Sequence, residues 1–66
     1  MFATVREREK LLRWLDAPVG ALTVGRRKGE DEMDVMIVRM RGGYSVPDSK
    51  RMPRFDGFPV EYLTES

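Results

Sequence analysis

The chain has 66 residues with no cysteine and no histidine, and these absences exclude most enzyme classes. Disulfide bonds, thiolate metal sites and histidine-dependent acid-base or nucleophilic catalysis cannot be built without those side chains. A mechanism with two carboxylates needs a cleft that buries one of them, and a domain this short has little interior for it. We therefore expect one small domain over residues 1–66 that is not an enzyme and uses no metal or cofactor.

Charge and hydropathy argue against two further classes, nucleic-acid-binding proteins and membrane proteins. Lysine and arginine number 12 against 11 acidic residues, so the formal net charge is +1, which is weak for a nucleic-acid-binding domain. No apolar run approaches the ~20 residues that span a bilayer, and the first residues lack a secretory signal pattern. We expect a cytoplasmic protein without membrane contact. A core of this size rarely supplies more than roughly 3–5 kcal/mol of stability, which favours self-association.

Residues 5–16 are predicted to form a helix. Thr4 and Glu7 have the spacing of a capping box, in which each side chain satisfies a free backbone N–H of the first turn. Pro18 disfavours helix at the residue before it and so ends the segment near Asp16. The apolar positions of the segment form one stripe, in which we expect Leu12 and Leu15 to be core residues; the stripe consists of Val5, Leu11, Leu12, Trp14 and Leu15.

Three strands are predicted after the helix. Residues 19–26 and 58–63 alternate between apolar and other side chains, whereas 33–40 carries apolar side chains on both of its faces. A strand of the latter kind lies centrally in a sheet that is covered on both sides. The charged segment 27–32 contains a glycine and is predicted to be the exposed turn between the first two strands.

The predicted fold class is α+β, with the N-terminal helix packed on a small three-stranded, mainly antiparallel sheet. A long loop, residues 42–57, joins the second and third strands, and residues 64–66 are a polar tail expected to fray. One helix covers one face of the sheet. The second face is then covered either by the long loop or by another copy of the chain, and we expect a homodimer formed through the sheet.

The function predicted from these features is that of a small interaction or regulatory module that binds a protein partner. The alternative is a nucleic-acid-binding module that uses the basic residues of the helix and of the segment 44–57, namely Arg6, Arg13, Lys50, Arg51 and Arg54. A simpler interpretation of that segment is that its aromatic residues close the core and its basic residues keep it soluble. The candidate interaction residues are Met36, Met40, Tyr44, Lys50, Arg51, Arg54 and Phe55.

Overall fold

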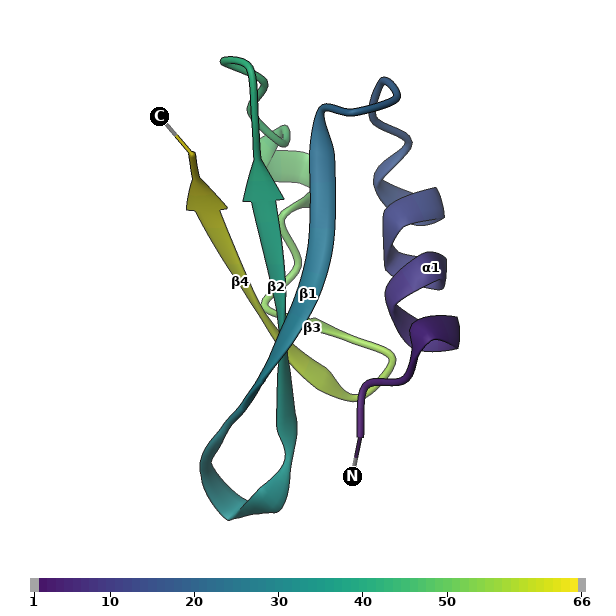
Figure 1. The fold of residues 1–66 in the computed structure, drawn as a ribbon, viewed down its shortest axis with the longest axis vertical. Helices are drawn as coiled ribbons and strands as arrows, with labels where there is room; N and C mark the ends of the chain where they lie inside the picture. The colour runs from purple at the N-terminus through teal and green to yellow at the C-terminus, as the bar shows by residue number, and fades with distance from the viewer. Residues whose placement is uncertain (1, 66) are drawn as a thin grey trace.

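A computed structural model describes residues 2–65 of the chain, and it contains one α-helix and a four-stranded sheet (Figure 1). Across the sheet the strands lie in the order β1-β2-β4-β3. Two single-turn 3₁₀ helices, η1 and η2, stand in the connections. The elements are α1 (Val5–Leu15), β1 (Leu22–Lys28), η1 (Glu30–Glu32), β2 (Asp34–Met40), η2 (Asp48–Lys50), β3 (Arg54–Phe55) and β4 (Phe58–Thr64).

The α+β class and the helix packed on a sheet are confirmed, whereas the expected three strands are wrong. The fourth strand is β3, which lies inside the segment predicted to be loop and pairs antiparallel with the start of β4. Asp56 and Gly57 join them with φ angles of 53° and 86°. Positive φ at both central residues is typical of a two-residue hairpin turn, and Asp-Gly is a preferred sequence for it. Such a turn makes even a two-residue strand possible.

The sheet is mixed because β2 and β4 run parallel, with Met36 opposite Val60 and Met40 opposite Thr64. Parallel neighbours need a connection of about a dozen residues or more, since the chain must return along the sheet before it can pair again. Residues 41–57 make this crossover, which explains the length of the connection. Thr64 belongs to β4 and the backbone N–H of Glu65 donates to the carbonyl of Met40, so the sheet extends into the predicted polar tail; Ser66 lies outside the described residues.

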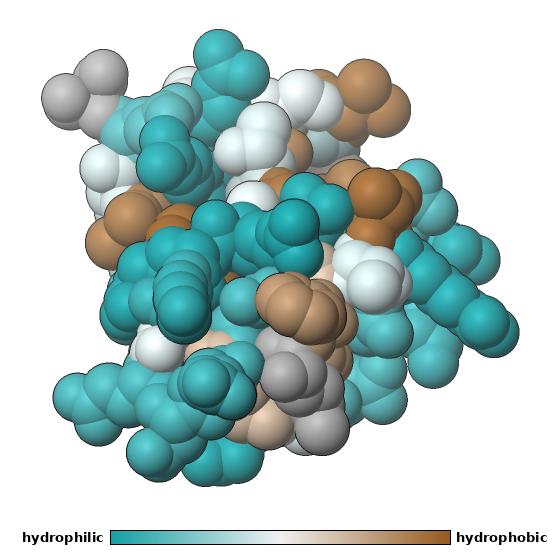
Figure 2. Space-filling model, turned by 60° about the horizontal axis from the view of Figure 1, so that its bottom comes forward, coloured by the Kyte–Doolittle hydropathy of each residue, from teal (hydrophilic) through white to brown (hydrophobic). Residues whose placement is uncertain are grey.

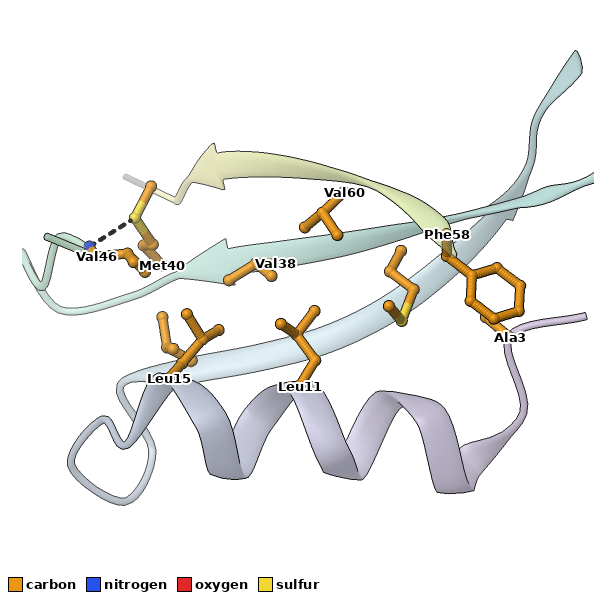
Figure 3. Close-up of a cluster of buried hydrophobic side chains, with 10 residues drawn as sticks. Ala3, Leu11, Leu15, Val38, Met40, Val46, Phe58 and Val60 are labelled. Atoms are coloured by element: carbon orange, nitrogen blue, oxygen red, sulfur yellow. Dashed lines mark hydrogen bonds between the residues drawn. The ribbon is translucent and has the colours of Figure 1, made fainter. Parts of the chain in front are cut away.

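The hydrophobic core lies between α1 and one face of the sheet (Figure 3). Leu11 and Leu15 of the helix point at the β2 and β4 side chains of that face, and both are buried. Leu12, in contrast, is 40% exposed, so its expected place in the core is wrong. The two leucines that share the core are four residues apart, which places them on one face of the helix, whereas Leu12 is turned about 100° away from Leu11.

The crossover contributes to this same side of the molecule. Val46 is buried in the core cluster, and its backbone N–H lies 3.3 Å from the sulfur of Met40. Tyr44 and Phe55 pack against the same cluster. The long connection therefore closes the core beside α1 and does not cover the second face of the sheet.

The second face, which we call the open face, is shielded by charged side chains. Val35 and Ile37 of β2 point to this side and are only 7% and 8% exposed, although neither belongs to the core cluster. Arg27 lies beside Val35 on β1, and Glu61 lies beside Ile37 on β4. These two side chains form an ion pair diagonally across β2. Their aliphatic portions cover the apolar strip, as long charged side chains often do.

Two polar contacts fix the N-terminal segment. The backbone N–H of Ala3 donates to Oδ2 of Asp34 at 2.9 Å, and the same oxygen accepts from Nη1 of Arg26 at 3.2 Å. Thr4 is the N-cap of α1, as predicted, but its hydroxyl donates to the Glu7 carboxylate and not to the backbone. This hydrogen bond is the main cause that lowers the pKa of Glu7.

Candidate functional site

The most developed surface site begins at Lys50, a residue predicted to contact a partner. Lys50 ends η2, and its Nζ lies 3.3 Å from the carbonyl oxygen of Leu15 and 3.4 Å from that of Trp14. The last carbonyls of a helix have no partner within it and carry the negative end of its dipole, so an ammonium group is well placed there. The same Nζ stands 5.6 Å from the centre of the Trp14 ring, within the range of a cation–π contact.

Trp14 forms the centre of the site. Its side chain projects from the flank of α1 that faces β3, where its ring centroid lies 6.3 Å from that of Phe55 with the planes tilted by 54°. This separation is within the range of favourable aromatic pairs. Phe55 is half-buried against the core, whereas Trp14 remains 39% exposed. The indole is therefore held between Phe55 and Lys50 and keeps an accessible surface.

Charged groups form the rim. Nζ of Lys10 lies 3.8 Å from Oδ2 of Asp56, which joins the helix to the β3–β4 turn. Arg13 has no ion pair among residues 2–65. Between helix and turn lies a groove of about 470 Å³. We call this the Trp14 groove; it is lined by Lys10, Arg13, Trp14, Phe55 and Asp56, with Lys50 at its end.

The groove combines an aromatic floor with three cations and one carboxylate. Such a surface binds a large apolar or aromatic side chain by contact with the indole, and an adjacent anion by contact with the basic rim. No group of three or more acidic side chains able to hold a metal ion comes together within the described residues.

Arg51, another candidate, holds the crossover in shape. Its Nε donates to the carbonyl of Val46 at 2.9 Å and its Nη2 to the hydroxyl of Ser45 at 2.8 Å. Its guanidinium also lies 5.9 Å from the centre of the Tyr62 ring. Burial raises the pKa of Tyr62, opposed by its hydrogen bond to the Met52 carbonyl and by the charge of Arg51. These contacts tie the exposed Arg51 side chain to its own chain.

The other candidates are dispersed. Met36 and Met40 are buried in the core, at 0% and 3% exposure, and offer no surface to a partner in this structure. Tyr44 packs against the far end of the core. Arg54 is exposed and lines a separate hollow beside the β1–β2 turn. Of the seven predicted interaction residues, Lys50 and Phe55 come together at the Trp14 groove, and Arg51 contacts the buried Met40 at 3.8 Å.

Sequence reasoning missed the partners that complete the groove. The sequence pattern places Trp14 in the apolar stripe of the helix, although the structure turns it away from the core leucines. The pattern indicates no role for Lys10 or Asp56. The signal that was present is that Trp14 is the only tryptophan of the chain and follows Arg13 directly.

A larger hollow of about 570 Å³ near the N-terminal segment is less suited to binding. It is lined by Phe2, by β1 residues and by Asp34. The Asp34 carboxylate already accepts hydrogen bonds from Ala3 and Arg26, so it is engaged within the chain. On the face that Figure 2 shows, hydrophobic residues form small areas separated by hydrophilic ones. No broad apolar surface is visible on that face.

The chain matches no protein family, no curated protein and no solved structure. Within the described part of the chain, no helix has the length and apolar character needed to cross a membrane. The geometry of the Trp14 groove is therefore the basis on which a function is proposed.

Proposed function

We propose that the protein is a small non-enzymatic interaction module whose Trp14 groove binds an acidic segment of a protein partner, with one large apolar side chain seated on the indole. The observation that carries this proposal is the exposed face of Trp14, held in place by Phe55 and Lys50. Tryptophan residues in such settings are over-represented among the residues that dominate binding energy at protein interfaces.

The charge of the rim supports an acidic partner. Lys10 is balanced by Asp56, whereas Arg13 has no acidic partner among residues 2–65 and Lys50 contacts only backbone carbonyls and the indole. The groove therefore keeps an excess of positive charge. A carboxylate next to the seated side chain would form a charge-assisted hydrogen bond with Arg13, which binds carboxylates in a fixed bidentate geometry.

The test is a selection from a displayed library of random peptides, carried out in parallel with the wild type, Trp14→Ala and Leu12→Ala. Leu12 is the matched control, because it lies on the same helix and is as exposed as Trp14 but is outside the groove. We expect the wild type and Leu12→Ala to select peptides that combine acidic and aromatic residues. Trp14→Ala should bind those peptides at least about tenfold more weakly, as measured by fluorescence anisotropy. Equal binding by Trp14→Ala would refute the proposal.

Nucleic acid is the second candidate, because Trp14 and Phe55 with a basic rim also suit stacked bases and phosphates. The discriminating measurement uses a mixed pool of single- and double-stranded nucleic acid at two salt concentrations. Binding that falls steeply with salt and is lost in Trp14→Ala would assign the groove to nucleic acid. Absence of binding at low salt excludes this alternative.

A further inference from the structure

The open face of the sheet has a charge pattern that is complementary to itself. Arg27 stands on β1 at the level of Val35, and Glu61 stands on β4 at the level of Ile37. One cation and one acid thus lie on either side of an apolar central strand. Both side chains are about half exposed, and their polar partners in the single chain are each other and the Lys28 carbonyl, so the pair can exchange its partners without unburying either side chain.

We propose that a second copy of this chain packs on the open face, with the two-fold axis parallel to β2, and that Arg27 and Glu61 exchange partners between the copies. This inference is independent of the Trp14 groove, which lies on the opposite, helix-covered side. Both surfaces can therefore be occupied at once.

The direction of the axis follows from the charges. A two-fold axis along β2 places β1 of one copy over β4 of the other, so that each Arg27 faces the partner's Glu61 side of the sheet. An axis across the strands would place β1 over β1 and β4 over β4, so that the Arg27 side meets the Arg27 side and the Glu61 side meets the Glu61 side, and this pattern provides no cross-copy attraction between the two residues. Packed sheets lie about 10 Å apart, a gap that an arginine and a glutamate reaching from opposite sides can bridge.

Shape and apolar content agree with this arrangement. When Arg27 and Glu61 turn toward the other copy, they uncover Val35 and Ile37, which then meet their counterparts near the axis. Gly25 lies directly beside Ile37, and the space where its side chain would stand is empty. With the axis along β2, this open space lies opposite Glu61 of the second copy, so that side chain has room to reach across the interface toward Arg27.

One feature opposes the contact. Arg39 also points to the open face from β2, so the two copies of Arg39 approach each other near the axis. Its Nη1 lies 3.8 Å from Oε1 of Glu65 in the same chain, which offsets part of that repulsion. The interface is accordingly expected to strengthen when Arg39 is replaced by a neutral residue such as glutamine.

The decisive experiment mixes two charge-reversed variants, Arg27→Glu and Glu61→Arg, in sedimentation equilibrium at micromolar concentration. Each variant alone places like charges across the interface and should remain near 7.6 kDa. In the mixture every cross-copy pair is attractive, so we expect a mass near twice that value, as for the wild type. Arg6→Glu, an exposed reversal on α1, is the control that should leave wild-type association unchanged.

Two results would overturn the proposal. The first is a wild type that stays at 7.6 kDa throughout the range; the second is a dimeric wild type whose two variants do not associate on mixing. If circular dichroism shows either variant to be unfolded, nuclear Overhauser effects between isotope-labelled and unlabelled wild-type copies replace the mixing test. Contacts between the Ile37 methyl groups of the two copies are then expected, and a dimer without them refutes this face.

Discussion

The apolar side chains on both faces of β2 are buried, but by different means. On one face Met36, Val38 and Met40 are covered by α1 and by the crossover, and the side chains interlock in a continuous core. On the other face Val35 and Ile37 lie beneath the ion pair of Arg27 with Glu61, and Val35 also packs against the β1–β2 turn at Gly29. Low exposure therefore does not mean the same thing on the two sides: one cover is built of a helix and the crossover, and the other consists largely of two half-exposed charged side chains.

The largest expected effect tests the helix-covered face. Leu15→Ala should lower the free energy of unfolding by roughly 2–5 kcal/mol, because it leaves a cavity between α1 and the sheet. Leu12→Ala is the matched control and should change it by less than about 1 kcal/mol, since that side chain is largely solvated. Urea denaturation followed by circular dichroism measures both. Equal losses in the two variants would mean that the helix is rotated from its described position.

Truncation of a buried side chain to alanine on the open face should lower the free energy of unfolding by less than it does on the helix-covered face. We expect Ile37→Ala to lower the free energy of unfolding by about 2 kcal/mol, the lower end of the range for buried aliphatic residues, because mobile charged side chains can close over the gap. The measurement is made at low protein concentration, so that association does not add to stability. A loss as large as that of Leu15→Ala would show that the ion pair is as rigid a cover as the helix.

Lys50 links the crossover to the helix, so its removal tests how firmly the helix side is closed. Lys50→Met should cost about 1 kcal/mol by removing the ammonium group from the helix terminus and from the indole. The fluorescence emission of the protein should change at the same time, because the ammonium group leaves the Trp14 ring. The emission reports on this site alone, since Trp14 is the only tryptophan. Lys28→Met, an exposed lysine at the end of β1, is expected to alter neither quantity.

The smallest effect concerns pH and acts on the first turn of α1 alone. The pKa of Glu7 is lowered from its ordinary value of 4.5, chiefly by the hydrogen bond from Thr4. A carboxylate with a depressed folded-state pKa stabilises the fold above the unfolded-state pKa and loses that contribution as the pH falls through the folded-state value. We therefore expect Glu7→Gln to be slightly less stable than the wild type near neutral pH and equal to it in strong acid. A difference that persists in acid would contradict this origin.

Sequence reasoning identified the elements whose signals are local. The helix was found from its cap at Thr4 and from Pro18, and β2 from its apolar side chains on both faces. Leu12 was misplaced because an apolar stripe that contains adjacent leucines does not specify which of them faces the sheet. The strand β3 was missed because two residues show no alternation, although Asp56-Gly57 carried a hairpin signal that was not used.

The site was harder to predict because it depends on contacts distant in sequence. Lys50 meets Trp14 only because the crossover runs back beside the helix, and that path follows from the parallel pairing of β2 with β4. Alternation of side chains gives the faces of a strand but not the direction of its neighbour. The second cover of β2 was sought in the loop or in a second copy, whereas in the single chain it is an ion pair between side chains of β1 and β4.

The crossover of residues 41–57 also sets an order of events during folding. β1 and β2 are joined by a short turn, so the hairpin can form with little loss of chain entropy. β4 joins only after the whole crossover has closed, a step whose entropic cost grows with the length of the loop. We therefore expect insertions in the crossover to slow folding while leaving the unfolding rate nearly unchanged. For the same reason, backbone amides that bond β4 to β2 should exchange with solvent before those between β1 and β2.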